Sequence, residues 1–152
     1  MELTRQSEYA IRTLIELAGA PEGVFIQSRV IAEKHSLPEK FLHKTIQVLG
    51  RTGFVETRRG MQGGIRLAVP AASLTIADIV VAIEGRIAIN PCLNESYYCK
   101  HKSACRVNGI LQRAQEAMIA ELSKETIADL AGEEQKAEAY TRGNSTCPGI
   151  MY

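Results

Sequence analysis

Three of the four cysteines, Cys92, Cys99 and Cys105, lie within fourteen residues of one another. The residues between them are mostly polar or charged, so this stretch cannot bury its thiols as a core segment would. Disulfides need an oxidising compartment, and three cysteines cannot pair among themselves without leaving one over. The spacing therefore favours a metal site, because three thiolates that converge on one point are suitable metal ligands.

Two other chemistries could use the same stretch. With His101, the three cysteines satisfy tetrahedral zinc as well as they satisfy iron. A thiol enzyme would need Cys99 or Cys105 as nucleophile and His101 as base. The chain supplies no oxyanion site, glycine-rich cofactor loop or paired acid–base system to support it. We therefore expect no enzymatic activity, and the colour and metal content of the purified protein would separate iron from zinc.

The basic residues concentrate in one part of the chain. The formal net charge of +1 hides a charge of +3 over residues 1–70 and −2 over residues 71–152. Residues 40–66 hold six lysines and arginines but one acid, Glu56. Such a concentration is suited to a polyanion, although an ordinary solvated basic face remains the alternative.

The N-terminal region predicts a helix-turn-helix. Apolar residues at helical spacing predict a helix over about 5–19 that stops before Pro21, and a short second helix over 28–35. Ser36 and Glu39 have the spacing of a capping box, which predicts a third helix ending at Gly53. Phe41 and other apolar positions are expected on its inner side. We expect DNA contacts from the second and third helices, at Ser28, Lys40, His43, Lys44, Gln47 and Arg51.

A β-hairpin is predicted directly after the third helix. Residues 54–58 and 65–69 have strand character, and three of the six residues from 59 to 64 are glycines, which allow a tight tip. Arg58, Arg59 and Gln62 would lie on this wing. Arginine on a hairpin tip is suited to phosphate contacts or to the narrow minor groove.

The second half of the chain carries the cysteines between two helices. Residues 70–74 read as a linker, and a helix buried on most sides is expected from Thr75 to Gly85. The cysteine loop, residues 86–105, follows. After it, apolar residues at steps of three and four predict a long helix with a stripe formed by Val107, Leu111, Ala114, Met118 and Leu122.

This stripe is too long for the N-terminal domain to cover, so we expect it to meet its copy in a homodimer, with packing inside one subunit as the alternative. A short capped helix over Thr126–Ala131 comes last. Residues 132–152, with Cys147, are expected to form a disordered tail.

The expected fold is mainly α with a small β wing: a winged helix-turn-helix plus a long C-terminal dimerisation helix. Its parts are a DNA-binding domain (1–70), a region with the buried helix, cysteine loop and dimerisation helix (71–131), and the tail. The charged N-terminus lacks the apolar stretch of a signal peptide, and no run is long enough to span a membrane. We therefore expect a cytoplasmic protein that does not engage a membrane.

The residues also carry a resemblance. The start Leu3-Thr4 with Tyr9-Ala10 and Arg12, the wing from Arg58 to Leu67, and the three spaced cysteines resemble the Rrf-two family of bacterial winged-helix regulators. Its members include the iron-sulfur assembly regulator IscR, the nitric-oxide-sensitive repressor NsrR and the rhizobial iron regulator RirA. Cys105-Arg-Val-Asn-Gly-Ile-Leu and Thr126-Ile-Ala-Asp-Leu look most like the nitric-oxide-sensitive branch.

The resemblance implies a homodimeric transcription regulator, expected to be a repressor, that binds a pseudo-palindromic operator in double-stranded DNA. It also implies a four-iron or two-iron cluster on the three cysteines, whose state changes DNA affinity in response to nitric oxide, redox or iron status. IscR-like members supply a histidine three residues after the last cysteine, but Asn108 stands there in this chain. NsrR-like members use an acid from the partner's first helix, which corresponds to Glu8. His101, His35, solvent or a small thiol are the other candidates for the fourth ligand.

Overall fold

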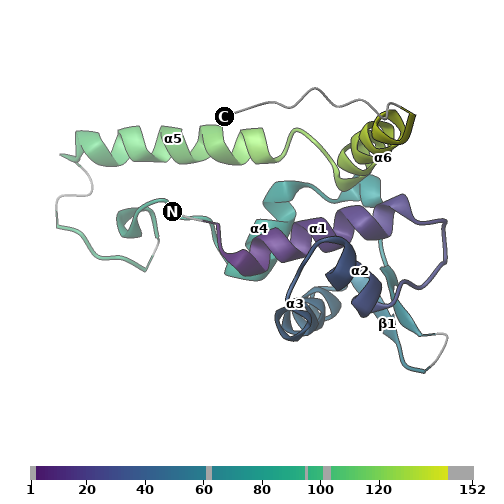
Figure 1. Cartoon of the computed structure of the whole chain (residues 1–152). Helices are drawn as coiled ribbons and strands as arrows, with labels where there is room; N and C mark the ends of the chain where they lie inside the picture. The colour runs from purple at the N-terminus through teal and green to yellow at the C-terminus, as the bar shows by residue number, and fades with distance from the viewer. Residues whose placement is uncertain (1–2, 61–62, 95, 101–103, 144–152) are drawn as a thin grey trace.

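The computed structural model describes residues 3–60, 63–94, 96–100 and 104–143, with side chains described up to residue 136. The elements are α1 (Arg5–Gly19), α2 (Ser28–Lys34), α3 (Glu39–Arg51), β1 (Val55–Arg58), β2 (Gly64–Leu67), η1 (Ala71–Ser73), α4 (Ile76–Glu84), η2 (Pro91–Leu93), α5 (Arg106–Leu122) and α6 (Ile127–Gly143). Helices α1, α2, α3, α4 and α6 form one domain with the β1–β2 hairpin, whereas α5 and the cysteine loop extend to one side (Figure 1).

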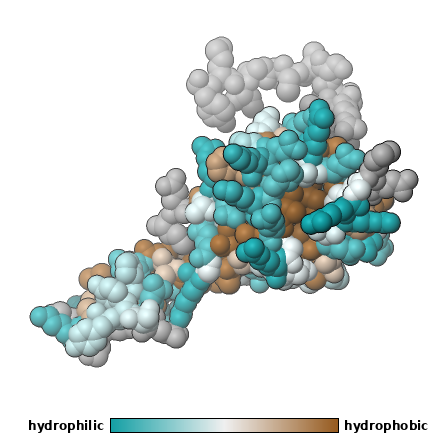
Figure 2. All heavy atoms as spheres, turned by 90° about the horizontal axis from the view of Figure 1, so that it is seen from below, coloured by the Kyte–Doolittle hydropathy of each residue, from teal (hydrophilic) through white to brown (hydrophobic). Residues whose placement is uncertain are grey.

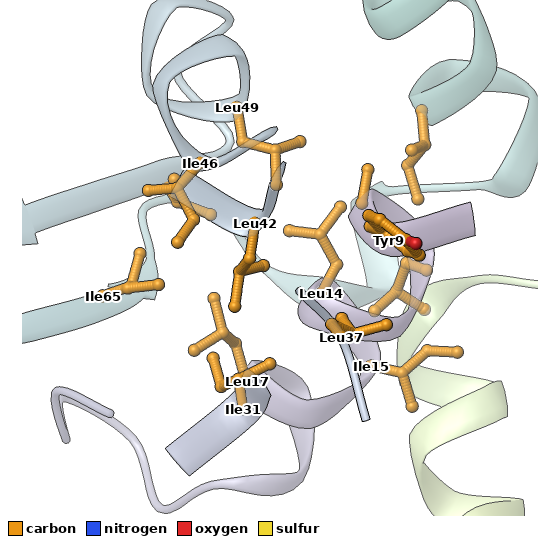
Figure 3. Close-up of a cluster of buried hydrophobic side chains, with 14 of the residues drawn as sticks. Tyr9, Leu14, Ile15, Leu17, Ile31, Leu37, Leu42, Ile46, Leu49 and Ile65 are labelled. Atoms are coloured by element: carbon orange, nitrogen blue, oxygen red, sulfur yellow. The ribbon is translucent and has the colours of Figure 1, made fainter. Parts of the chain in front are cut away.

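Helix α1 is the centre of the hydrophobic core. Thr4 caps its N-terminus, where its side chain accepts a hydrogen bond from the Ser7 amide. Its apolar face meets α3, α4, α6 and β2. Leu14 of α1 and Leu42 of α3 have no exposed surface and lie together in the cluster shown in Figure 3. The core therefore fixes the third helix against the first, as the helical spacing of the sequence predicts.

The turn between α2 and α3 differs from the prediction. Ser36 and Glu39 do not form a capping box, since the N-cap of α3 is Pro38 and no side chain caps it. Ser36 instead ends α2: its φ of 51° lies in the left-handed region, and the Leu37 amide donates to the Ala32 carbonyl at 2.8 Å. This is the hydrogen-bond pattern of a helix C-terminus, so the serine serves the end of α2 and not the start of α3.

The hairpin forms as predicted, with shorter strands. β1 pairs with β2 in antiparallel register from Val55 opposite Leu67 to Arg58 opposite Gly64. The loop after α1 joins the other edge of β2, because Ile26 and Ile65 exchange backbone hydrogen bonds of 2.8 and 2.9 Å. A side chain at Gly64 would lie 2.4 Å from the Ile26 carbonyl oxygen, so only glycine permits this close approach.

Two identical tetrapeptides, Thr-Ile-Ala-Asp, begin α4 and α6 and lie next to each other. In both, the aspartate accepts hydrogen bonds from the threonine amide and hydroxyl while its own amide donates to the threonine oxygen. Thr75 and Thr126 form a β-bridge, and the Ile127 amide donates to the Leu74 carbonyl at 2.8 Å. The chain therefore returns to the first domain after α5.

Helices α4 and α6 each differ from the sequence prediction in one respect: the burial of α4 and the length of α6. α4 is buried at Ala77, Ile79 and Val80, but Val81 keeps 49% of its surface exposed, so the helix is not buried on most sides. α6 continues to Gly143 and packs along α1, where the sequence predicts a short helix ending at residue 131 and a tail without regular structure. Residues 144–152, with Cys147, lie outside the described part of the chain.

Helix α5 follows the cysteine loop as predicted, over seventeen residues, all of which the structure describes. None of them is buried in the single chain. Val107 and Ile110 keep 61% and 57% of their surface exposed. Among the described residues, no helix is both long and apolar enough to cross a membrane.

Candidate nucleic-acid interface and cysteine site

A groove of about 550 Å³ lies between α2, α3 and the hairpin. Ser28, at the start of α2, lies 3.1 Å from His43 of α3, oxygen to Nε2. Arg58 and Arg59 line the opposite side, from the end of β1 and the turn after it. The structure therefore brings the predicted second helix, third helix and wing to one groove.

The other predicted contact residues of α3 are exposed. Lys40, Lys44, Gln47 and Arg51 all face solvent, and Figure 2 shows the underside of the molecule as mainly hydrophilic around a smaller apolar area. Phe41 does not lie on the inner side of the helix as predicted, since it is 58% exposed. The centre of its ring lies 5.9 Å from the Lys44 ammonium nitrogen. Gln62 lies outside the described residues.

Two interactions around the wing were not predicted from the sequence. Phe25 lies beneath two guanidinium groups, those of Arg66 at 4.7 Å and Arg58 at 6.0 Å from the ring centre. Arg66 also donates two hydrogen bonds to its cross-strand partner Glu56. Of the wing's basic residues, Arg66 is thus held by an acid, whereas Arg58 and Arg59 remain exposed. The sequence signal for the position of Phe25 is the run of three consecutive apolar, strand-favouring residues Val24, Phe25 and Ile26.

The sulfurs of Cys92 and Cys105 are held through one residue, Asn108. Cys105 is the N-cap of α5, and its sulfur accepts a hydrogen bond from the Asn108 amide at 3.4 Å. The Asn108 side chain donates to the Cys92 sulfur and to the Cys92 carbonyl, both at 3.4 Å. From the other side, the Cys92 amide donates to the Asn90 side chain at 3.1 Å. A sulfur at a helix N-terminus is also in a field that favours negative charge.

Within the described residues, no hydrogen bond holds the third cysteine, Cys99. Cys99 is half-buried, and no group of three metal-binding side chains is closely assembled within the described residues. His101 lies outside the described residues. His35, another candidate ligand, instead contacts α1: its Nε2 lies 3.1 Å from the carboxylate of Glu16, which also pairs with Lys34 at 2.8 Å. Three soft thiolate donors, two of them already held together at a helix start, are a donor set that fits iron–sulfur or zinc chemistry.

Glu8, the predicted fourth ligand, lies in the first turn of α1, where its carboxylate pairs with Arg12 at 3.0 Å. Its side chain is 44% exposed. The acid is thus at the surface, and within the described residues its carboxylate is held by one salt bridge of the kind that contributes little to stability.

The start of the cysteine loop is tied to the start of α1. Glu84, the last residue of α4, accepts hydrogen bonds from the Ser7 hydroxyl at 2.6 Å and the Thr4 amide at 2.9 Å. These bonds hold the pKa of Glu84 below its ordinary value, with the Ser7 hydroxyl as the main cause. Gly85, with φ of 83°, then turns the chain into the loop. The loop is therefore anchored one residue from Glu8.

A helix-turn-helix with a β wing, exposed basic residues along one groove and a cysteine site outside it define a winged-helix DNA-binding protein. Residues 3–133 match the model of the Rrf2 family, described as iron-dependent transcriptional regulators. The chain belongs to this family, which consists of transcription regulators and not enzymes.

Solved structures agree with this fold. The chain is similar to CymR (YrzC), the global cysteine regulator of B. subtilis, with 24% identity, a TM-score of 0.67, and coverage of 88% of this chain and 98% of that one. It is similar to the oxidised form of Staphylococcus aureus CymR, with 26% identity, a TM-score of 0.66, and coverage of 86% and 96%. It also resembles IscR of T. potens, with 20% identity, a TM-score of 0.70, and coverage of 98% and 94%.

Proposed function

We propose that this protein is a repressor whose affinity for its operator is switched by the state of an iron–sulfur cluster, in response to nitric oxide, redox or iron status. The observation that carries the proposal is the pair of sulfurs, Cys92 and Cys105, held at the start of α5 in a chain that also carries a DNA-binding groove. Similarity to IscR and membership of a family described as iron-dependent support it.

In the DNA complex, we place α3 in the major groove. His43 and Gln47 would read base edges, since they are exposed on this helix and carry hydrogen-bonding groups. Ser28, Lys40, Lys44 and Arg51 would contact phosphates around the groove. On the wing, Arg58, Arg59 and Gln62 would contact the adjacent backbone or minor groove, with Phe25 beneath Arg58 fixing its direction.

The cysteines would hold a four-iron or two-iron cluster, with Glu8 of the partner subunit as the fourth ligand. A bound cluster would supply a centre that nitric oxide, oxygen or iron shortage destroys. Glu8 is suited to this role because its side chain is 44% exposed and, in the part of the chain that the structure describes, its carboxylate pairs with Arg12 alone. Asn108 offers an amide and not the imidazole found at this position in IscR-like proteins, so it leaves that ligand position open.

The chain's own contacts provide a route from the loop to the DNA-binding groove. A change in the cysteine loop acts on Glu84, which holds Ser7 and Thr4 at the start of α1. Helix α1 packs directly on α3. Ordering the loop therefore biases the position of α3, and in a dimer it sets the angle between the two recognition helices. That angle decides whether both reach successive major grooves of a pseudo-palindromic operator.

The exposed apolar residues of α5 support a homodimer, in which each helix covers the other. Near the C-terminal end of α5, Ile119 and Val81 of α4 line a separate apolar groove of about 630 Å³. We place the protein in the cytoplasm, where operator DNA is found and where cysteines stay reduced.

The test is to purify the protein without oxygen, record its visible spectrum and count iron and sulfide, then measure operator binding before and after nitric oxide. We expect brown protein that binds the operator and loses affinity after exposure. Cys92→Ala, Cys99→Ala and Cys105→Ala should each be colourless, whereas Cys147→Ala keeps the colour. Colourless parental protein with stoichiometric zinc would instead establish a winged-helix protein with a structural zinc site.

A further inference from the structure

Asn108 is the residue through which the cysteine loop and α5 are joined. The residue contributes three hydrogen bonds to the two cysteines: one from its backbone amide to the Cys105 sulfur, and two from its side chain to the sulfur and carbonyl of Cys92. Sixteen residues separate Asn108 from Cys92 along the chain. These contacts therefore close a long loop, not a local turn.

The chemistry of the side chain suits sulfur ligands. A carboxamide has two N–H donors and no charge, so it can donate to an anionic sulfur without repelling it. A carboxylate would repel the same sulfur, and an aliphatic side chain would offer no donor. The Asn90 side chain also accepts a hydrogen bond from the backbone amide of Cys92, so Asn90 and Asn108 together hold the backbone on both sides of this cysteine side chain.

We propose that Asn108 is a positioning residue that assembles two of the three cysteine ligands before any metal binds and donates a hydrogen bond to the Cys92 sulfur in the loaded site. The inference rests on the proposed metal site and assigns Asn108 a role toward it. Cys99, which no such contact fixes within the described residues, then closes the site as the last thiolate to arrive.

The first experiment uses Co²⁺ as the probe in metal-free, reduced full-length protein, with the cobalt–thiolate absorption as readout. Asn108→Leu keeps the length and branching of the side chain but removes the donors, and residues that orient metal ligands contribute about 10- to 100-fold to metal affinity. We therefore expect Asn108→Leu to bind Co²⁺ about 10- to 100-fold more weakly. Asn108→Gln keeps the amide and should retain most of the affinity. Gln112→Leu is the matched control, because Gln112 lies on the same helix and its side chain donates to Glu116 and not to a cysteine. This variant should behave as the parent.

The second experiment measures the reduction potential of the reconstituted cluster. Hydrogen bonds to ligand sulfurs stabilise the more negative, reduced state, so they raise the potential. Asn108→Leu should therefore have a lower midpoint potential than the parent, and Asn108→Gln should lie between them. A side chain that only fills space would give the opposite order, because leucine shares the length and the branching at Cγ of asparagine, whereas glutamine is one methylene longer.

The outcomes separate this inference from the proposed function. Parental cobalt affinity and potential in Asn108→Leu would overturn the positioning role, as would equal losses in Asn108→Leu and Asn108→Gln. Absence of a cobalt–thiolate band in the parent would overturn the metal site and the inference with it. A third outcome is that cobalt binding depends on Asn108 but operator affinity does not change with cluster state. That outcome would support the inference and overturn the proposed switch.

Discussion

The exposed apolar face of α5 leads to a quantitative prediction about assembly. Val107 and Ile110 keep 61% and 57% of their surface in contact with solvent. Full burial of an aliphatic side chain of this size stabilises by about 1.5–3 kcal/mol, so covering the exposed part contributes about 0.9–1.8 kcal/mol for each. Each residue occurs twice in a two-fold interface, which gives about 4–7 kcal/mol in total.

Replacing both residues with serine should therefore weaken the dimer by about three to five powers of ten in Kd. Sedimentation equilibrium over a range of concentrations measures this constant for the parent and for the Val107→Ser/Ile110→Ser variant. The control is Gln112→Ser, which changes an exposed polar residue of the same helix. We expect the control to dimerise like the parent.

The single subunit should tolerate the same change, because neither side chain is buried within it. Circular dichroism of the monomeric variant should show parental helix content. A variant that remains a tight dimer would show that α5 is not the interface. A monomer that has lost helix content would show that these side chains stabilise the subunit itself.

The remaining predictions concern the DNA groove and the Glu84 contact. Arg59→Ala should weaken binding to all DNA sequences and reduce the salt dependence of log K by about one unit, since a phosphate contact is lost, whereas His43→Ala should change the consensus recovered from a binding-site selection. Unchanged affinity and slope in Arg59→Ala would remove the wing from the interface. Glu84→Gln should lower the melting temperature at pH 7. Because the folded-state pKa of Glu84 lies below its unfolded value, its stabilisation is present above the unfolded pKa and is lost as pH falls through the folded pKa. The difference in melting temperature between parent and variant should therefore shrink below about pH 4, and a difference that persists there would place its cause elsewhere.

The sequence predicts most of the fold because its patterns are local. The wing follows from glycines at a tip between two short strands, and the long helix from apolar residues at steps of three and four. The predicted start of α3 is wrong because Ser36 can either cap the start of one helix or end another. In the structure it ends α2 in the left-handed conformation. The length of α6 was missed because residues 132–143 lack an apolar stripe, although alanine, glutamate and lysine there favour helix.

The sequence predicts the cysteines of the candidate metal site but not the residues that hydrogen-bond to the loop and hold it in place. The spacing of three cysteines within a polar stretch is visible in the sequence. The contact between Asn108 and Cys92 depends on how α5 and η2 meet across sixteen residues, and the contact between Glu84 and Ser7 spans seventy-seven. Neither pair has a periodicity or motif that marks it, because such contacts arise only once the helices have packed.

The proposed homodimer would account for both the exposed face of α5 and the missing fourth ligand. A single chain leaves Val107 and Ile110 exposed, and within the described residues the carboxylate of Glu8 pairs with Arg12 alone. A two-fold partner would cover the apolar face and, by the same symmetry operation, bring each Glu8 to the other subunit's cysteines. The Val107→Ser/Ile110→Ser monomer therefore also tests the fourth ligand. If Glu8 acts across the dimer, this monomer should resemble Glu8→Ala in its visible spectrum while keeping all three cysteines, and a parental spectrum in the monomer would assign the fourth ligand to the subunit itself or to solvent.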